Sequence, residues 1–138
     1  MPDPKEQVML FVENVLTSAQ VKALVATDVS LIAAPGVGKI IVPLFHVLTL
    51  KFATIAYTWA NTDHSITVGG AVTDSDAEAQ ALIESADRHS IVLRPAVDSA
   101  ELAENTALFI GATGTGEPAA GDSTLLVKTY YTIINVTK

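Results

Sequence analysis

The sequence contains no cysteine, and this absence excludes disulfide bonds, thiolate catalysis and cysteine-ligated metal sites. Basic residues are also scarce, because eight Lys and Arg stand against 15 Asp and Glu and leave a formal net charge of −7 at pH 7. An acidic field repels both nucleic-acid phosphates and anionic lipid headgroups. We therefore expect neither nucleic acid nor a membrane as a partner.

Long uninterrupted hydrophobic runs are missing as well. The apolar run from Val8 to Leu16 is interrupted by Glu13 and Asn14, and the residues before it form no basic segment. A run of this length is too short to span a bilayer, and its flanks are not those of a signal peptide. We expect neither feature here.

Charged residues make up only 17% of the 138 residues, whereas hydrophobic residues make up 49%. This composition is too apolar for a disordered chain and low in charge for a soluble monomer. We expect one folded domain over residues 8–138 that keeps some apolar surface for a partner. Residues 1–7 contain two prolines and are expected to form an N-terminal arm.

Forty of the residues are Val, Ile or Thr, whose β-branched side chains favour strands. The apolar pattern and the turn residues predict strands over residues 8–15, 29–33, 39–52, 54–60, 65–68, 90–94, 107–111 and 123–136. Residues 54–60 and 65–68 are expected to pair as a meander, and Pro43 to mark a bulge or an edge. The fold class is therefore mainly β, a jelly-roll-like antiparallel β-sandwich.

Helices are expected to be short and peripheral. Thr17 or Ser18 can cap a helix over residues 19–24. Residues 74–87 leave two alternatives open, because Asp74 or Ser75 could cap a short helix but a strand is also compatible with the segment. We favour the helix.

Motifs for chemistry are incomplete. The segment Ala34 to Ile40 resembles a phosphate-binding loop but lacks the first glycine and the hydroxyl that would hold magnesium. The three histidines, His46, His64 and His89, are not spaced as metal ligands on one element, and His46 is expected in the core or an interface. We expect no enzymatic activity, no catalytic residue, no cofactor and no metal.

Two aromatic residues, Tyr57 and Trp59, lie two positions apart and so share one face of a strand. Side chains of this kind are either core residues or interface anchors. Both interpretations stay open at this point.

Several segments together resemble the small β-rich virion proteins of tailed bacteriophages. They are the stretches 16–24 and 29–42, a strand around Tyr57, and the ending from Gly121 to Ile134. This resemblance covers most of the chain. It implies a jelly-roll-like capsid decoration (cement) protein on the outer surface of the virion, made in the host cytoplasm, with no catalytic residue and no cofactor.

The resemblance also implies the partners: the major capsid protein and further copies of the chain, as a trimer in preference to a dimer. We expect the arm residues Pro2, Asp3, Pro4 and Lys5, together with Tyr57 and Trp59, to contact a partner. The alternative is a tail-side virion protein, such as a fibre, baseplate or host-adsorption component, whose sandwich binds a glycan. Its expected cleft would contain Trp59, Tyr57 and Asp63.

Overall fold

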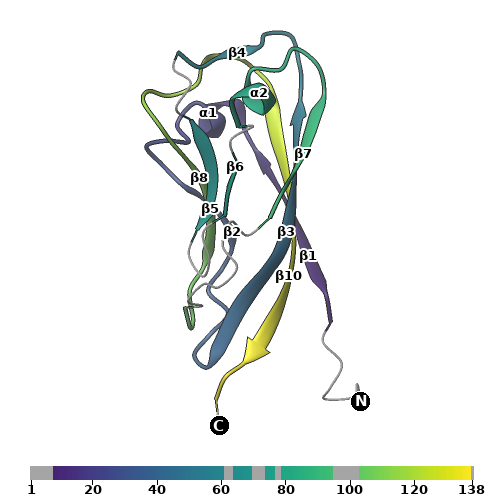
Figure 1. Ribbon diagram of the computed structural model, residues 1–138, viewed down its shortest axis with the longest axis vertical. Helices are drawn as coiled ribbons and strands as arrows, with labels where there is room; N and C mark the ends of the chain where they lie inside the picture. Colours follow the sequence, from purple (N-terminus) through teal and green to yellow (C-terminus); the bar gives the residue numbers. More distant parts are fainter. Residues whose placement is uncertain (1–7, 61–63, 70–73, 77–78, 95–102, 138) are drawn as a thin grey trace.

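The computed structural model of the protein describes residues 8–60, 64–69, 74–76, 79–94 and 103–137. Two four-stranded antiparallel sheets face each other (Figure 1). The first sheet contains, in spatial order, β1 (Leu10–Leu16), β10 (Thr124–Asn135), β3 (Lys39–Lys51) and β7 (His89–Leu93). The second contains β2 (Val29–Ile32), β8 (Leu108–Thr113), β5 (Ser65–Gly69) and β6 (Asp74–Asp76).

The pairing of these eight strands is nested along the chain. The first strand pairs with the last, β1 with β10; moving inward, β2 pairs with β8, β3 with β7, and β5 with β6. A hairpin of eight strands rolled up in this way is a jelly roll. The predicted mainly β sandwich is therefore confirmed, and the nested pairing supplies the strand order.

The long strand β3 illustrates how the sequence produces the sheet. Its inward residues His46, Leu48 and Leu50 are all fully buried, whereas the alternate residues Val47 and Thr49 are half-buried on the outer face. This period of two is the pattern of a strand that packs on one side. The expected irregularity at Pro43 is present, because the register with β10 shifts at this point and leaves Leu44 without a partner across the ladder.

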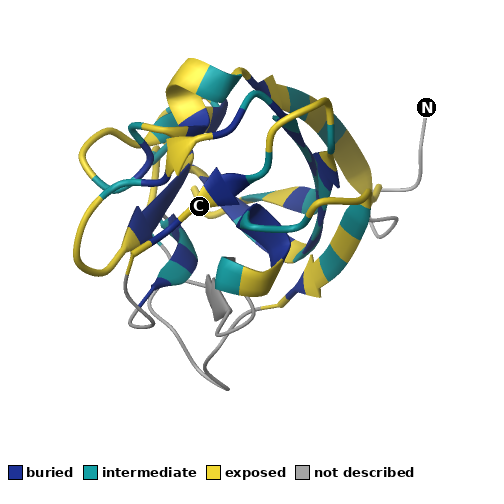
Figure 2. Cartoon of the chain, turned by 90° about the horizontal axis from the view of Figure 1, so that it is seen from above, coloured by how far each residue is buried: buried dark blue, intermediate teal, exposed yellow. Residues whose placement is uncertain are grey.

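The core fills the space between the two sheets. Seen from above, the buried segments line the interior and the exposed ones lie outside (Figure 2). Its fully buried aliphatic side chains come from both sheets and both helices, and include Leu16, Val21, Leu24, Leu48, Leu50, Ile66, Val68, Leu82, Ile83, Leu108, Ile110, Leu125 and Val127. A core shared in this way holds the two sheets at a fixed separation.

Two short helices lie at one end of the sandwich, near β4 in Figure 1. The helix α1 (Ser18–Val21) begins with a capping box: the Thr17 side chain accepts from the Gln20 N–H, and the Gln20 side chain accepts from the Thr17 N–H. The expected N-terminal cap is confirmed, although the helix is shorter than the predicted stretch 19–24. Among the described residues, no helix has the length and apolar character needed to cross a membrane.

Two predictions need correction. The expected strand over residues 54–60 is only the two-residue β4 (Tyr57–Thr58), which pairs with β9 (Ala119–Ala120) and not with residues 65–68. Residues 74–87 contain both alternatives in succession, because β6 is followed by the helix α2 (Ala79–Ile83). In both cases strand pairing decided the outcome, with the distant β9 for β4 and with the preceding strand β5 for β6, and residue propensity did not predict it.

Candidate interaction surface

Three aromatic rings form one row across the outer face of the first sheet. Phe11 lies opposite Tyr130 in the β1–β10 ladder, and Tyr130 lies opposite Phe45 in the β10–β3 ladder. The ring centroids are 5.7 Å apart for Phe11 and Tyr130 and 4.5 Å apart for Tyr130 and Phe45, and both pairs are stacked. Opposed residues of antiparallel strands point to the same face, so the register fixes the row. Phe11 is nevertheless 60% exposed.

Aliphatic side chains extend this surface along and across the sheet. Val15 on β1 and Val92 on β7 are exposed, and Val47 on β3 and Leu126 on β10 are half-buried. We call the surface made by the outward residues of these four strands the aromatic face; its apolar members are Phe11, Val15, Phe45, Val47, Val92, Leu126 and Tyr130.

Two pairs of polar residues at the centre of the aromatic face interact with each other. Lys128 forms an ion pair with Glu13, its neighbour across the β1–β10 ladder, with Nζ and Oε1 3.3 Å apart. The Thr49 and Ser90 hydroxyls are hydrogen-bonded at 2.8 Å across the β3–β7 ladder. A half-exposed ion pair contributes little to stability. Its consequence here is that the centre of the aromatic face carries no net charge although the whole chain is acidic.

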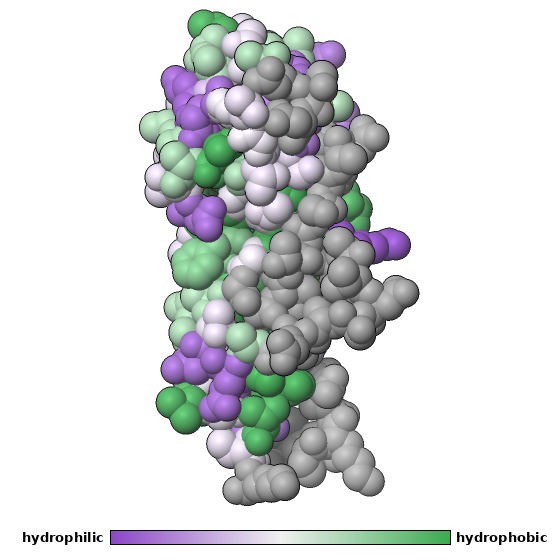
Figure 3. Space-filling model, turned by 60° about the vertical axis from the view of Figure 1, so that its left-hand side comes forward, coloured by the Kyte–Doolittle hydropathy of each residue, from purple (hydrophilic) through white to green (hydrophobic). Residues whose placement is uncertain are grey.

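The outer face of the second sheet has a different character. Its outward residues are mostly small and polar: Ser30, Ser65, Thr67, Phe109, Gly111 and Thr113. Figure 3 shows the side of the molecule on which this sheet lies, where strongly hydrophobic residues occur in small groups between hydrophilic and neutral ones. The two outer faces are therefore unequal, and the aromatic face is the one suited to an apolar contact.

Tyr57 and Trp59, which the sequence offered as contact residues, are both only 2% exposed. The Trp59 ring stacks on His64 with centroids 3.7 Å apart, and its Nε1–H donates to the Gly116 carbonyl at 2.9 Å. The Tyr57 hydroxyl donates to the Ser123 carbonyl. Of the two interpretations left open, the core one describes both side chains, and neither presents a ring to a partner or to a glycan on the surface of the chain.

Tyr57 and the nearby Asp122 also have shifted pKa values. Burial, together with the negative charge of Asp122, raises the pKa of the Tyr57 hydroxyl to about 12. Hydrogen bonds from the Thr54 hydroxyl and from the N–H groups of Ile55 and Thr54 lower the pKa of Asp122 to about 2. These contacts tie residues 54–57 to the start of β10, so they are structural in character.

The remaining predicted contact residues, Pro2, Asp3, Pro4 and Lys5, lie outside the described residues, and so does Asp63 of the alternative glycan cleft. Their roles stay predictions. By contrast, sequence reasoning did not select Phe11, Phe45 and Tyr130 as contact residues. A signal was present, because Phe45 shares its face of β3 with Thr49 and Lys51, which indicates a solvent-facing side.

The histidines lie in separate places. His46 is fully buried, and its Nδ1 is 3.0 Å from the Thr129 hydroxyl, which confirms the expected hydrogen-bonded core histidine. His64 stacks on Trp59, and His89 begins β7. Within the described ranges, no group of three or more His, Asp or Glu residues is placed to hold a metal ion.

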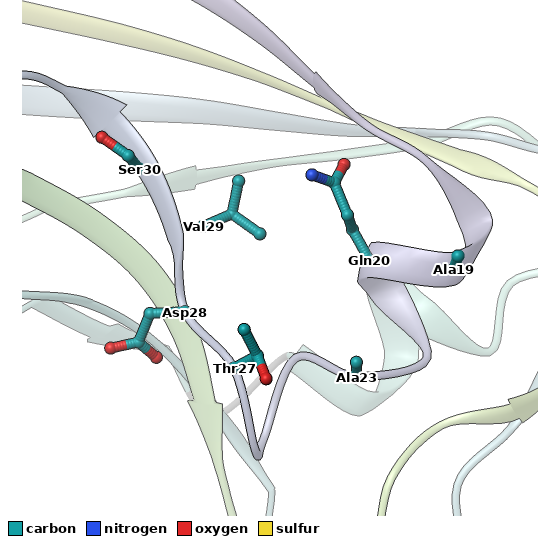
Figure 4. Close-up of a pocket in the computed structure, with 7 residues that line it drawn as sticks. All are labelled: Ala19, Gln20, Ala23, Thr27, Asp28, Val29 and Ser30. Carbon is teal, nitrogen blue, oxygen red and sulfur yellow. The ribbon is translucent and has the colours of Figure 1, made fainter.

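An open depression of about 400 Å³ lies between α1 and β2 (Figure 4). It is lined by Ala19, Gln20, Ala23, Thr27, Asp28, Val29 and Ser30. In Figure 4 the side chains of Gln20 and Val29 lie over this space, whereas the Asp28 carboxylate points away from α1. Four of these seven residues are polar, but Asp28 is the one titratable residue among them, so the lining brings no pair of titratable groups together.

No family model and no curated protein matches the chain. A solved structure described as the cyanophage Pam1 capsid asymmetric unit contains a chain that is similar, with 16% sequence identity and a TM-score of 0.49. The match covers 96% of this chain and 91% of that chain. Similarity at this level assigns neither fold nor function to the protein.

Proposed function

We propose that the protein is a capsid decoration (cement) protein, a non-enzymatic virion component. In this role it binds the outer surface of a bacteriophage head and stabilises contacts between major capsid protein subunits. The observation that carries the proposal is the aromatic face, on which Phe11, Tyr130 and Phe45 are stacked on the outside of a four-stranded sheet. Exposed aromatic and aliphatic side chains gathered on one side mark an interaction surface.

The physical requirements of a cement protein agree with this surface. Its work is the burial of area between neighbouring coat subunits, at about 25 cal/mol per Å² of apolar surface before the costs of association. The rings are already held by the ladder and by each other, so little side-chain freedom is lost on binding. Small contacts of this kind, repeated many times over a shell, together oppose its expansion.

The charge distribution also favours an orientation in which the aromatic face contacts the coat subunits. The Glu13–Lys128 pair leaves the centre of the aromatic face neutral, so an apolar coat surface needs no matching ion there. The net charge of −7 is carried elsewhere on the chain and suits a protein that faces outward from packaged DNA.

The expected arm, residues 1–7, would contact the coat from the edge of the aromatic face at which β1 lies. The described chain starts at Val8, two residues before β1, so residues 1–7 join the molecule beside Phe11. Seven extended residues span at most about 25 Å. Deleting residues 1–7 is expected to lower occupancy on the shell and to leave the isolated domain folded.

The proposal is tested by adding the purified protein to capsids that were assembled without it and measuring co-sedimentation against protein concentration. The wild-type protein is expected to bind saturably and in a fixed ratio to the coat subunit. Phe11→Ser is expected to weaken binding about tenfold or more, since an interface aromatic commonly contributes above about 1.4 kcal/mol. Phe109→Ser is the matched control, because it makes the same change on the outer face of the second sheet, where Phe109 is 37% exposed.

Two outcomes would contradict the proposal. The wild-type protein could fail to bind capsids at all, or the Phe109 variant could lose as much affinity as the Phe11 variant. Thermal unfolding of each variant shows that it is folded before binding is measured. If the protein does not bind capsids but binds a host glycan, this result would favour the tail-side alternative.

A further inference from the structure

Four consecutive hydrophobic residues at the N-terminal end of β1 are exposed. Val8, Met9, Leu10 and Phe11 are 61%, 58%, 36% and 60% exposed. Side chains of a strand alternate between the two faces of a sheet, so a strand that packs on one face shows every second residue. Exposure of all four means that both faces of the strand are open here, and a partner that covered only the aromatic face would leave Val8 and Leu10 in water.

Leu10 and Phe11 of this segment belong to β1, and Val8 and Met9 directly precede it. Leu10 and Phe11 are in register with Tyr131 and Tyr130 of β10, and the Thr132 hydroxyl donates to the Val8 carbonyl at 3.3 Å. On the inner face the other half of β1 is covered, because the Asn14 side-chain amide donates to the Leu31 carbonyl of β2 and Leu16 is fully buried. Only the N-terminal end is therefore exposed on both faces.

This half also forms an unprotected edge. Among the described residues, β1 is the last strand of its sheet and pairs only with β10. Natural edge strands are blunted by proline, charged side chains, a bulge or short length. The stretch from Val8 to Val12 contains neither proline nor a charged residue, and the register of β1 with β10 has no shift. The opposite edge strand, β7, is five residues long and is followed in the sequence by Arg94 and Pro95.

We propose that the N-terminal half of β1 pairs with β1 of a second copy of the chain. The two strands run antiparallel, related by a two-fold axis at Leu10. A strand added at the edge brings side chains to both faces at once, which is the cover that these four residues lack, and it binds the open backbone groups of the edge.

The sequence of the strand selects both the partner and the register. Opposed residues must lie on the same face, so the exposed run can meet itself in registers centred on Met9, Leu10 or Phe11. With Met9 at the centre, Phe11 meets the polar Gln7. With Phe11 at the centre, Met9 meets the charged Glu13.

Only the register centred on Leu10 gives every exposed residue an apolar partner. Leu10 meets its own copy, Met9 meets Phe11, and Val8 meets Val12. Residues 8–12 carry no charge, and this register keeps the two Glu13 side chains about 20 Å apart along the ladder, beyond the screening length of roughly 8–10 Å. The two Glu13 side chains therefore form no close like-charge pair in this dimer.

This inference goes beyond the proposed function, because the pairing needs no capsid. It gives a dimer and not the trimer expected from the resemblance, and it joins two aromatic faces side by side on one continuous eight-stranded sheet. Four side chains from each copy cover less than the roughly 800 Å² per partner of a standard interface. The dimer is accordingly expected to be reversible, with dissociation in the micromolar range.

Sedimentation velocity over a range of protein concentrations, without capsids, tests the proposal. The wild-type protein is expected to shift from monomer to dimer. Met9→Lys is expected to weaken the dimer about tenfold or more, whereas Val92→Lys is expected to leave it unchanged. The two changes are matched, because Met9 and Val92 lie at opposite edges of the same sheet and are 58% and 51% exposed. A protein that stays monomeric at hundreds of micromolar, or that forms trimers, would overturn the proposal.

A single introduced cysteine tests the register, since the natural chain has none. Residues opposed across an antiparallel pair have Cα atoms about 4.5–5.5 Å apart, a separation that a disulfide spans. Leu10→Cys is expected to form a covalent dimer under mild oxidation, and Val92→Cys is expected to stay monomeric. Equal cross-linking of the two variants, with both folded by circular dichroism, would contradict the pairing at Leu10. Because no capsid is present, failure here is distinct from failure of the decoration role.

Discussion

Tyr130 and Phe45 stack with ring centroids 4.5 Å apart, and they form the last pair of the β10–β3 ladder before its register shifts at Tyr131 and Pro43. A bulge increases the local twist and redirects the side chains that follow it. The ring row therefore marks the point at which the flat part of the outer face ends. Phe11 completes the row from the edge strand, so the aromatic face depends on one register across three strands.

Removal of the central ring should cost more stability than removal of the peripheral one. Tyr130 is half-buried and packs against rings on both sides, whereas Phe11 is 60% exposed and packs on one. We expect Tyr130→Ser to lower the free energy of unfolding by about 1–3 kcal/mol and Phe11→Ser by less than about 1 kcal/mol. Urea unfolding measures both, and equal losses would show that the three rings do not act as a stack.

The packing of Gly121 on Tyr57 gives a second expectation. A Cβ at Gly121 would lie 2.1 Å from the Tyr57 ring, which is confined in the core. A Cβ at Gly111 would lie 2.1 Å from the end of the exposed Asp28 side chain, which can move aside. We expect Gly121→Ala to lower the free energy of unfolding by about 1–3 kcal/mol, and Gly111→Ala to lower it less. Thermal unfolding shows this as a larger drop in melting temperature for Gly121→Ala. The reverse order would mean that the Tyr57 ring yields easily.

Acid should weaken the contact between Asp122 and residues 54–55. The pKa of Asp122 is about 2 in the folded chain against an ordinary value of 3.8, so its stabilising effect is complete above about pH 4 and is lost as the pH falls towards 2. We expect the difference in unfolding free energy between the wild type and Asp122→Asn to shrink over this range. A difference that is constant with pH would show that the carboxylate charge has no role.

At high pH the protein should lose stability through ionisation of Tyr57. Its pKa is raised to about 12, above the ordinary value of 10, so the unfolded chain ionises first. The stabilising effect is present below about pH 10 and is lost as the pH rises towards 12. Tyr57→Phe should remove this part of the alkaline unfolding profile. An unchanged profile in that variant would contradict the assignment.

The Glu117 carboxylate joins the loop between β8 and β9 to residues 25–26. Glu117 accepts hydrogen bonds from the N–H groups of Val25 and Ala26, at 2.8 and 2.6 Å. We expect Glu117→Ala to destabilise the chain by about 1–2 kcal/mol and to speed amide hydrogen exchange at Val25 and Ala26. Unchanged exchange at these two amides would show that the carboxylate does not hold them.

Long elements could be read from the sequence because one pattern dominates them. The alternation along β3 and β10, the bulge at Pro43 and the cap at Thr17 all result from local chemistry. The two-residue β4 carries no period, so its pairing with β9 could not be predicted. The strand β6 reads Asp-Ser-Asp, a sequence more typical of a helix start, and only its place beside β5 makes it a strand.

The aromatic face was harder to predict from the sequence than the long strands. Tyr57 and Trp59 were recognised as sharing a face, but a pattern two residues long does not tell which face points inward. The ring row joins residues 11, 45 and 130, so recognising it requires the nested pairing of the jelly roll. Near Phe11 the local pattern does not separate the two faces of the strand, because Glu13 lies on the face of Phe11 and Asn14 on the opposite face.

The most direct test of the central claim is an electron cryomicroscopy map of capsids saturated with the protein. The account expects each copy to lie on the outer surface of the shell with the aromatic face of β1, β10, β3 and β7 against the coat subunits. A map in which the copies are absent from the shell, or in which the outer face of β2, β8 and β5 contacts the coat instead, would contradict it.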